Sequence, residues 1–483
     1  MLRRLFKHFR ALYLSLFTTM LVAGTVQAQT EPVLTNADLE RRVRELEAKI
    51  ELLTSAPPAI VQPAAAPSAP PSDTNRAPPV VEAVATPSKP LAGWDNGFFM
   101  RSEDDRFRLR LTGQIQGDYR GYLDTGDRVD ISQFLLRRAR FGLEAELFKY
   151  YEFRFLPDYA QGQARIQDSY INVHYWDAFQ VEGGKFKQPF SYEQLIQDRF
   201  TPLMERSLID QLVPARDVGV MMHGQKLFGN RFDWAASVSN GAINGDGDTN
   251  SLKDYAFRTA VRPFKGLDAP LFDNLQLGFA YTTGVEQELT TFNLKTPAGV
   301  QYFNFLPNVR ADGLRNRWSP EVAYFYKGFG FASQYFKLDQ EFRAPNGLSR
   351  INVSADGWYV MATALLTGEP RTGYSEAIDP LQPFDPRPGE FGIGAWELVG
   401  RVSRLQLSNN VFLPGGARLA DPTRVSNGTT EMTLGFNWYL NKFVRAQFNW
   451  EHSWFDRPVQ LGPAKTQFFT TNDALMMRFQ IIF

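Results

Sequence analysis

Arginines recur at alternate positions in several segments of this 483-residue sequence, and they are the residues best suited to do chemistry. In 107–121 they occupy the polar positions, opposite Phe107 and Leu109. The guanidinium group presents a rigid fork of donors that matches the oxygens of phosphate and carboxylate. Side chains two residues apart share one face of a strand, so these arginines are predicted to line a common surface that binds anions. Alternation places six arginines there: Arg108, Arg110, Arg120, Arg138, Arg140 and Arg401.

Carboxylates share these faces and support a second interpretation. Glu144 and Glu146 have the same parity as Arg138 and Arg140, which predicts a wall of paired charges like that of a general channel. Residues 91–483 hold 42 Lys and Arg against 44 Asp and Glu. A preference for anions must therefore arise from local placement of charge.

The composition excludes several classes of protein. The absence of cysteine rules out disulfide scaffolds, zinc fingers, iron–sulfur clusters and thiol nucleophiles. A formal net charge of +0 argues against nucleic-acid binding. We find no nucleophile–base spacing, metal-ligand set or nucleotide fingerprint, so neither an enzyme nor a cofactor is expected. Mean hydropathy is −0.31, yet the chain holds 40 Phe and 37 Gly, a combination that fits half-apolar strands, including those of membrane β-barrels.

Alternation with period two dominates 97–483 and predicts an all-β fold. In 430–440, Met432, Leu434 and Phe436 alternate with Glu431 and Thr433. Long strands with one apolar and one strongly polar face predict a transmembrane antiparallel β-barrel with lipid outside and water inside. We expect about sixteen strands, at 106–121, 134–148, 151–157, 166–176, 179–187, 217–228, 231–239, 254–263, 274–284, 320–327, 329–340, 356–367, 393–407, 430–440, 443–455 and 473–483.

The connections test this count. Short turns are expected at 149–150, 229–230, 327–328 and 440–442, and long loops include 188–216, 285–319 and 408–429. Residues 368–392, with five prolines, fall where a short turn is expected, so the count is open at that point. An even number of strands places both ends of the barrel on the periplasmic side.

The end of the chain resembles an assembly signal. Leu475, Met477, Phe479 and Ile481 alternate up to the terminal Phe483. A terminal Phe on an alternating strand resembles the signal that the outer-membrane barrel assembly machinery reads. We expect Phe483 to serve that role.

Three segments precede the barrel. Residues 1–28 combine a basic start, an apolar run and a small-residue site, which is typical of a signal peptide. Within 29–55, Leu39, Val43, Leu46, Ile50 and Leu53 form a heptad seam that predicts a short coiled coil, or alternatively a single amphipathic helix. Residues 56–90 hold 10 of the 30 prolines and predict a semi-rigid periplasmic linker.

The barrel segment resembles the phosphate-selective porin O and P family of outer membranes. The resemblance covers 97–483 within the expected barrel domain, 91–483. It rests on segments such as 136–141 (LRRARF), 168–171 (DSYI), 184–190 (GKFKQPF), 204–207 (MERS), 397–403 (ELVGRVS) and 437–441 (NWYLN). It implies a trimeric porin whose third long loop, 188–216, narrows the lumen and binds anions with the wall. On that loop and at its base lie Lys185, Lys187, Arg199 and Arg206.

Two functions follow from these expectations. The first is an outer-membrane porin for passive diffusion of small solutes, with anions such as phosphate as the expected solutes, through an Arg- and Lys-lined constriction. It would be surrounded by outer-membrane lipid, with the N-terminal tail in the periplasm. The second is a structural anchor in which the coiled coil and linker hold the barrel to the cell wall.

Overall fold

The computed structural model describes residues 91–123, 130–242, 247–248, 250–461 and 467–483. The predicted signal peptide, coiled coil and linker lie outside the described residues. Among the residues that are described, none of the helices is both long enough and apolar enough to cross a membrane.

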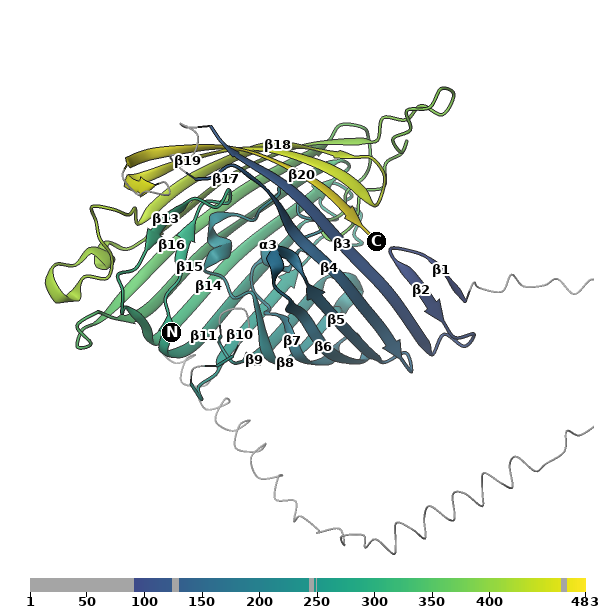
Figure 1. Cartoon of the computed structure of the whole chain (residues 1–483). Helices are drawn as coiled ribbons and strands as arrows, with labels where there is room; N and C mark the ends of the chain where they lie inside the picture. Colours follow the sequence, from purple (N-terminus) through teal and green to yellow (C-terminus); the bar gives the residue numbers. More distant parts are fainter. Residues whose placement is uncertain (1–90, 124–129, 243–246, 249, 462–466) are drawn as a thin grey trace, which may run out of the picture. The chain divides into compact units, whose positions relative to one another are not determined.

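Sixteen antiparallel strands form a closed ring (Figure 1). Each strand pairs with the next along the chain, and the last strand pairs with the first, as Met477 opposite Tyr119 illustrates. The strands of the ring are β3 (Phe107–Tyr122), β4 (Gln133–Leu147), β5 (Tyr151–Asp158), β6 (Arg165–Trp176), β7 (Phe179–Lys187), β8 (Arg216–Lys226), β9 (Phe232–Ser239), β10 (Asp254–Val261), β11 (Gln276–Thr290), β14 (Arg310–Tyr326), β15 (Phe329–Arg343), β16 (Arg350–Leu365), β17 (Ala395–Leu407), β18 (Gly428–Tyr439), β19 (Val444–Leu461) and β20 (Gln467–Ile482). The predicted strand number and order are confirmed.

The two faces of the strands separate as alternation predicts. Leu434 and Phe436 of β18 are exposed on the outside, whereas Glu431, Thr433 and Asn437 are buried inside. Because the outer face is apolar, the closed ring has the surface that a lipid environment requires.

The ring closes at the C-terminus. The N–H of Phe483 donates to the carbonyl of Gly113 at 3.0 Å, and the N–H of Gly113 donates back at 2.7 Å. A Cβ on Gly113 would lie 2.1 Å from the aromatic ring of Phe483, so glycine is required where this side chain crosses β3. Phe483 also approaches Trp94 and Phe141, with ring centroids 5.9 Å and 6.5 Å away.

Several boundaries differ from those expected. Strand β14 begins ten residues earlier than the expected 320, and β19 continues to Leu461. A hairpin of β1 (Ala92–Trp94) and β2 (Phe98–Arg101), which the sequence did not indicate, pairs with β3 through Phe98 and Leu111. A second small hairpin, β12 (Asn293–Lys295) and β13 (Gln301–Asn304), lies within the long loop between β11 and β14.

The proline-rich segment 366–394 does join two strands at the short-turn end, so no strand is missing there. Its first half packs on the barrel mouth, where Arg371 forms a buried ion pair of 2.9 Å with Glu397 of β17. The N–H of Arg371 also donates to the carbonyl of Lys327 in the neighbouring turn. The segment is longer than a short turn because part of it folds against the barrel through these contacts of Arg371.

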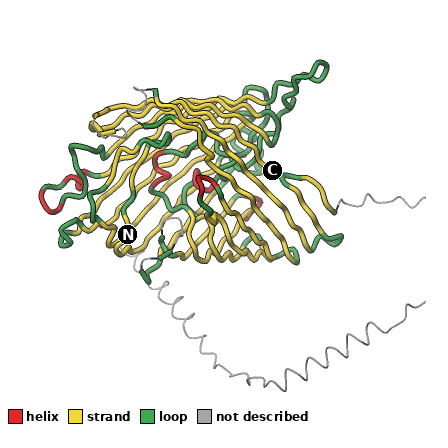
Figure 2. The backbone as a smooth tube through the Cα atoms, viewed as in Figure 1, coloured by secondary structure: helices red, strands yellow, loops and turns green. Residues whose placement is uncertain are grey.

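Loops fill much of the barrel interior (Figure 2). Side chains from 188–215, 291–309 and 408–427 form one apolar cluster with the inward residues of β14 to β16. Phe336, Phe342 and Tyr359 are inward-facing and fully buried in it. The expectation of a uniformly polar, water-facing interior is therefore wrong for the parts of these strands that contribute to the cluster. Each buried Phe or Leu side chain contributes roughly 2 kcal/mol to this packing.

The helical pieces in the described part of the chain are all short. They are η2 (Ala160–Gly162), α3 (Tyr192–Leu195), η3 (Leu208–Gln211), α4 (Leu227–Asn230), η5 (Asn409–Phe412) and η6 (Gly415–Ala417). Two of them, α3 and η3, belong to the loop 188–215, and α3 lies inside the ring of strands (Figure 1).

Candidate functional site

The loop 188–215 crosses the barrel interior and is fastened to the opposite wall. The amides of Asn437 and Gln447 donate to the carbonyl of Pro202 at 2.8 Å and 3.1 Å. The N–H of Met204 donates to Asn449 at 2.9 Å. These wall residues are buried, so the loop replaces the water that would otherwise solvate them.

Two carboxylates of the loop are each surrounded by three arginines. Asp198 contacts Arg206 at 2.6 Å, Arg138 at 3.5 Å and Arg140. These contacts join the loop to β4, so breaking them would leave charges buried and unpaired.

The second carboxylate, Glu205, joins the loop to arginines on three strands, β3, β4 and β20. It accepts hydrogen bonds from Arg120 at 2.6 Å, Arg137 at 2.7 Å and Arg478 at 3.2 Å. Arg478 is itself paired with Asp118 at 2.7 Å, and both side chains are fully buried.

The ionisation of these loop carboxylates follows from their surroundings. Burial alone would raise the pKa of Asp198, but the arginines around it, led by Arg138, hold that pKa well below its usual range. Burial opposes ionisation of Glu205 in the same way, and Arg137 and Arg120 hold its pKa well below the usual range. Both groups are therefore anionic at neutral pH.

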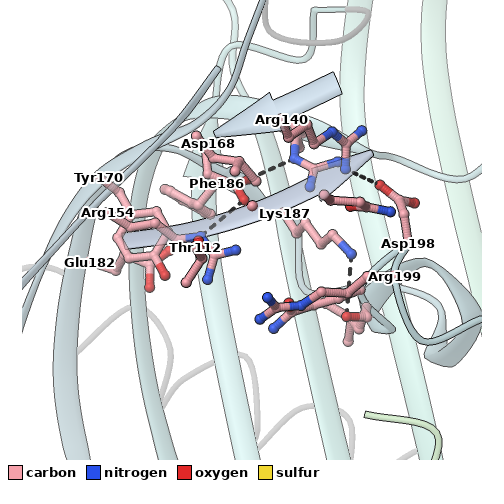
Figure 3. Close-up of a pocket in the computed structure, with 16 residues that line it drawn as sticks. Thr112, Arg140, Arg154, Asp168, Tyr170, Glu182, Phe186, Lys187, Asp198 and Arg199 are labelled. Carbon is pink, nitrogen blue, oxygen red and sulfur yellow. Dashed lines mark hydrogen bonds and ion pairs between the residues drawn. The ribbon is translucent and has the colours of Figure 1, made fainter. Parts of the chain in front are cut away.

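An inner cavity of about 190 Å³ lies between the loop and strands β3 to β8 (Figure 3). Five of its lining residues are basic and three are acidic. The basic residues are Arg140, Arg154, Lys187, Arg199 and Arg216, and the acidic ones are Asp168, Glu182 and Asp198.

An outer cavity of about 510 Å³ lies toward the long-loop end. It shares Arg140, Asp198 and Arg216 with the inner cavity, so the two meet at these side chains. Seven of its lining residues are arginines and four are aspartates: Arg137, Arg138, Arg140, Arg206, Arg216, Arg315 and Arg317, with Asp198, Asp210, Asp217 and Asp254.

Most of these cations already have partners. Arg154 and Arg216 both contact Asp168, at 3.3 Å and 2.6 Å. Lys187 donates to the carbonyls of Gln194 and Ile196 at 2.7 Å and 2.8 Å, at the end of α3. Arg199 differs, because the only hydrogen bond that its side chain makes in the described part of the chain goes to Gln197, at 2.8 Å, and its guanidinium lies over the Phe200 ring.

Five of the sequence-predicted residues line the two cavities. Arg138 and Arg206 line the outer one, Lys187 and Arg199 the inner one, and Arg140 both. Arg110 lines a third cavity of about 370 Å³ at the short-turn end, together with Arg199.

The other four predicted residues lie elsewhere. Arg401 has a side chain that is 1% exposed and pairs with Glu193 of the loop at 3.2 Å, and Arg120 is bound to Glu205. Arg108 is exposed near the end of β3, where its guanidinium lies over the Phe99 ring.

Lys185 has the outward parity of Val181, and it pairs across strands with Val218 on the apolar outer surface. The prediction that Lys185 faces the interior is therefore corrected.

Sequence parity missed several residues of the site. A β-bulge between Gln116 and Gly117 of β3 leaves Arg137 without a partner in the register. Such a bulge reverses alternation locally, so Arg137 turns inward to Glu205. Arg315 and Arg317 lie in the part of β14 that was expected to be loop, and period-two spacing in 310–319 is the signal that would have identified them.

The closed sixteen-stranded barrel, its apolar outer face and its loop-narrowed interior define an outer-membrane channel protein of the porin class. Within the described ranges, no cluster of three or more His, Cys, Asp or Glu side chains is arranged to hold a metal ion. The chain belongs to the phosphate-selective porin O and P family, whose sequence pattern matches residues 109–483.

Comparison with known proteins gives the following similarities. No curated protein sequence matches the chain. OmpT of Vibrio cholerae has 9% identity and a TM-score of 0.48, over 80% of this chain and 100% of that one. Salmonella typhi OmpF in complex with daunomycin has 13% identity and a TM-score of 0.47, over 80% and 100%. OprB of Pseudomonas putida has 10% identity and a TM-score of 0.45, over 78% and 94%.

Proposed function

We propose that this porin is a water-filled channel for passive diffusion of small solutes across the outer membrane and that it prefers anions such as phosphate. The observation that carries the proposal is the local charge. Arginine and lysine outnumber acidic side chains five to three in the inner cavity and seven to four in the outer one. The barrel segment as a whole has 42 basic and 44 acidic residues, so the excess is confined to the solute path.

Arg199 is the cation best placed to contact a passing anion in the inner cavity. It makes no ion pair with any described residue, whereas Arg140, Arg154 and Arg216 are bound to carboxylates. Burial lowers the pKa of Arg199 to about 10, which leaves its guanidinium charged at neutral pH. A guanidinium with free donors replaces part of an anion's hydration without trapping it permanently.

Reversal potentials in asymmetric KCl, measured on channels in planar bilayers, test this function. We expect chloride to be more permeant than potassium, and Arg199→Gln to reduce both that ratio and the block of chloride current by phosphate. Arg404→Gln is the matched control, because Arg404 lies on the outward face and pairs with Asp456 at 2.8 Å. Potassium preference in the wild type would contradict anion selectivity.

We further propose that the barrel assembles as a trimer in outer-membrane lipid, with Phe483 read by the barrel assembly machinery and the N-terminal tail in the periplasm. The apolar outer face supports a lipid environment. One similar structure, OmpT of Vibrio cholerae, is described as a trimer form. Native mass spectrometry in mild detergent tests the trimer, and a monomer under all conditions would contradict it.

A further inference from the structure

Arg317 of β14 is a buried arginine that lines the outer cavity and has no hydrogen-bond or ion-pair partner among the described residues. It is 6% exposed, and its Nε and Nη1 atoms have no hydrogen-bond acceptor among the described residues. Arg315, two residues away on the same face, provides the contrast. Its guanidinium is bound by Asp254 at 2.6 Å and also by Glu286.

A buried charge without a counter-charge is unfavourable, because the protein replaces only part of its hydration. Buried polar groups in proteins almost always have partners, so an exception that faces a cavity is placed to bind a group inside that cavity. The two unmet donors belong to a guanidinium fork, which binds the paired oxygens of a carboxylate or phosphate group.

The neighbours of Arg317 in the sheet complete a site. The register places Ala256, Thr282, Arg317 and Leu338 side by side on β10, β11, β14 and β15, and all four line the outer cavity. Thr282 is 2% exposed, and its Oγ1 also lacks a hydrogen-bond partner in the described chain. Facing side chains on adjacent strands are about 5 Å apart at Cβ, so Thr282 and Arg317 can contact one group.

The same row is apolar at both ends. Ala256 and Leu338 flank the polar pair, at 8% and 2% exposure. The cavity of about 510 Å³ lies within the size range of small-molecule sites. Leu338 and Ala256 present apolar surface to the cavity, and an organic anion has an apolar part to place against that surface, whereas an inorganic ion has none.

We propose that Arg317 and Thr282 bind the oxyanion group of a small organic anion, a carboxylate or phosphate ester, whose apolar part lies against Leu338 and Ala256. This inference rests on the proposed function for the access of the solute, and it names a solute class beyond inorganic phosphate. The site lies at the long-loop end. In the proposed orientation this end is extracellular, so the site would concentrate the anion at the entrance.

Calorimetric titration of the full-length folded protein in detergent tests the site with benzoate, acetate and inorganic phosphate. We expect benzoate to bind more tightly than acetate or phosphate. Arg317→Gln should weaken benzoate binding at least about tenfold, since a charge-assisted hydrogen bond is lost, and Thr282→Val about threefold. Arg317→Lys should restore part of the affinity, because the charge remains but the fork is lost.

Thr283→Val is the matched control, since it makes the same change on the next residue of β11, on the outward face. Heat-modifiable mobility on gels verifies that each variant is folded. Benzoate affinity unchanged by both Arg317→Gln and Thr282→Val would overturn the site. Phosphate binding as tightly as benzoate would overturn the organic class.

The titration separates this inference from the channel proposal. Arg317-dependent benzoate binding by a protein that conducts no ions supports the site and contradicts the channel. Normal conductance without benzoate binding contradicts the site and leaves the channel function in place.

Discussion

At the scale of single residues, the decisive property of each arginine is whether its charge is already neutralised. Arg138, Arg140 and Arg206 converge on Asp198, so their donors hold the loop. Arg199 and Arg317 make no ion pair with a described residue. Arginines of equal formal charge therefore differ in function. Only an arginine whose donors are free, such as Arg199 or Arg317 in the described part of the chain, can add a hydrogen bond to a solute.

Asp210 gives a pH prediction at the same scale. Burial, with Glu193 and Asp198 nearby, raises its pKa to about 6 in spite of Arg206. Because this pKa lies above the value in water, Asp210 is neutral below pH 6 and adds a negative charge to the outer cavity as the pH rises through 6. The raised pKa also means that protonated Asp210 stabilises the folded state. This contribution to the free energy of unfolding is present at low pH and is lost as the pH rises through 6.

We therefore expect the chloride-to-potassium permeability ratio to be higher at pH 5 than at pH 8, with a midpoint near 6. Reversal potentials across this range measure the effect. Asp210→Asn should retain the high ratio at both pH values. A wild-type ratio that rises with pH would contradict the assignment.

At the scale of elements, the loop 188–215 is a folded part of the barrel. It is held by the arginines around Asp198 and Glu205 and by side-chain amides of β18 and β19. The constriction is therefore set by ion pairs between the loop and the wall as much as by the conformation of the loop.

Glu205→Gln tests this attachment. Three arginines would lose a common partner, and breaking a buried pair costs about 3 kcal/mol or more. We expect a lower urea midpoint on heat-modifiable gels and a larger, noisier single-channel conductance. Glu390→Gln removes an exposed pair with Arg387 and should change stability by less than about 1 kcal/mol. Equal effects of the two variants would rule out the attachment role.

At the scale of the whole molecule, the barrel is nearly neutral and its interior is unequally filled. Apolar side chains of the loops pack on part of the inward face of β14 to β16, while the two cavities are lined by basic residues, including Arg315 and Arg317 of β14. The field that a solute meets is therefore local, and salt screens it over about 10 Å at 0.1 M and about 3 Å at 1 M.

This geometry predicts salt-dependent selectivity. We expect the chloride preference to be pronounced in gradients around 0.1 M KCl and to fall substantially around 1 M. Reversal potentials at a fixed concentration ratio provide the measurement. A preference that persists undiminished at 1 M would indicate direct binding rather than the local field as its source.

The sequence by itself determined the architecture. Sixteen strands, their order, their inward and outward faces and the terminal strand are all readable, because alternation is a local property with a period of two residues. It also identified 188–216 as a loop of the site through a family resemblance, and the family is confirmed.

Only the tertiary structure decided which arginines are available to a solute. Asp198 lies about 60 residues from Arg138 and Arg140, and Glu205 lies 273 residues from Arg478. The bulge that turns Arg137 inward, the loops that pack inside the barrel and the lack of a partner for Arg317 among the described residues depend on such distant contacts. A strand's period specifies the side on which a residue lies, whereas its partner is specified by how the closed barrel brings distant segments together.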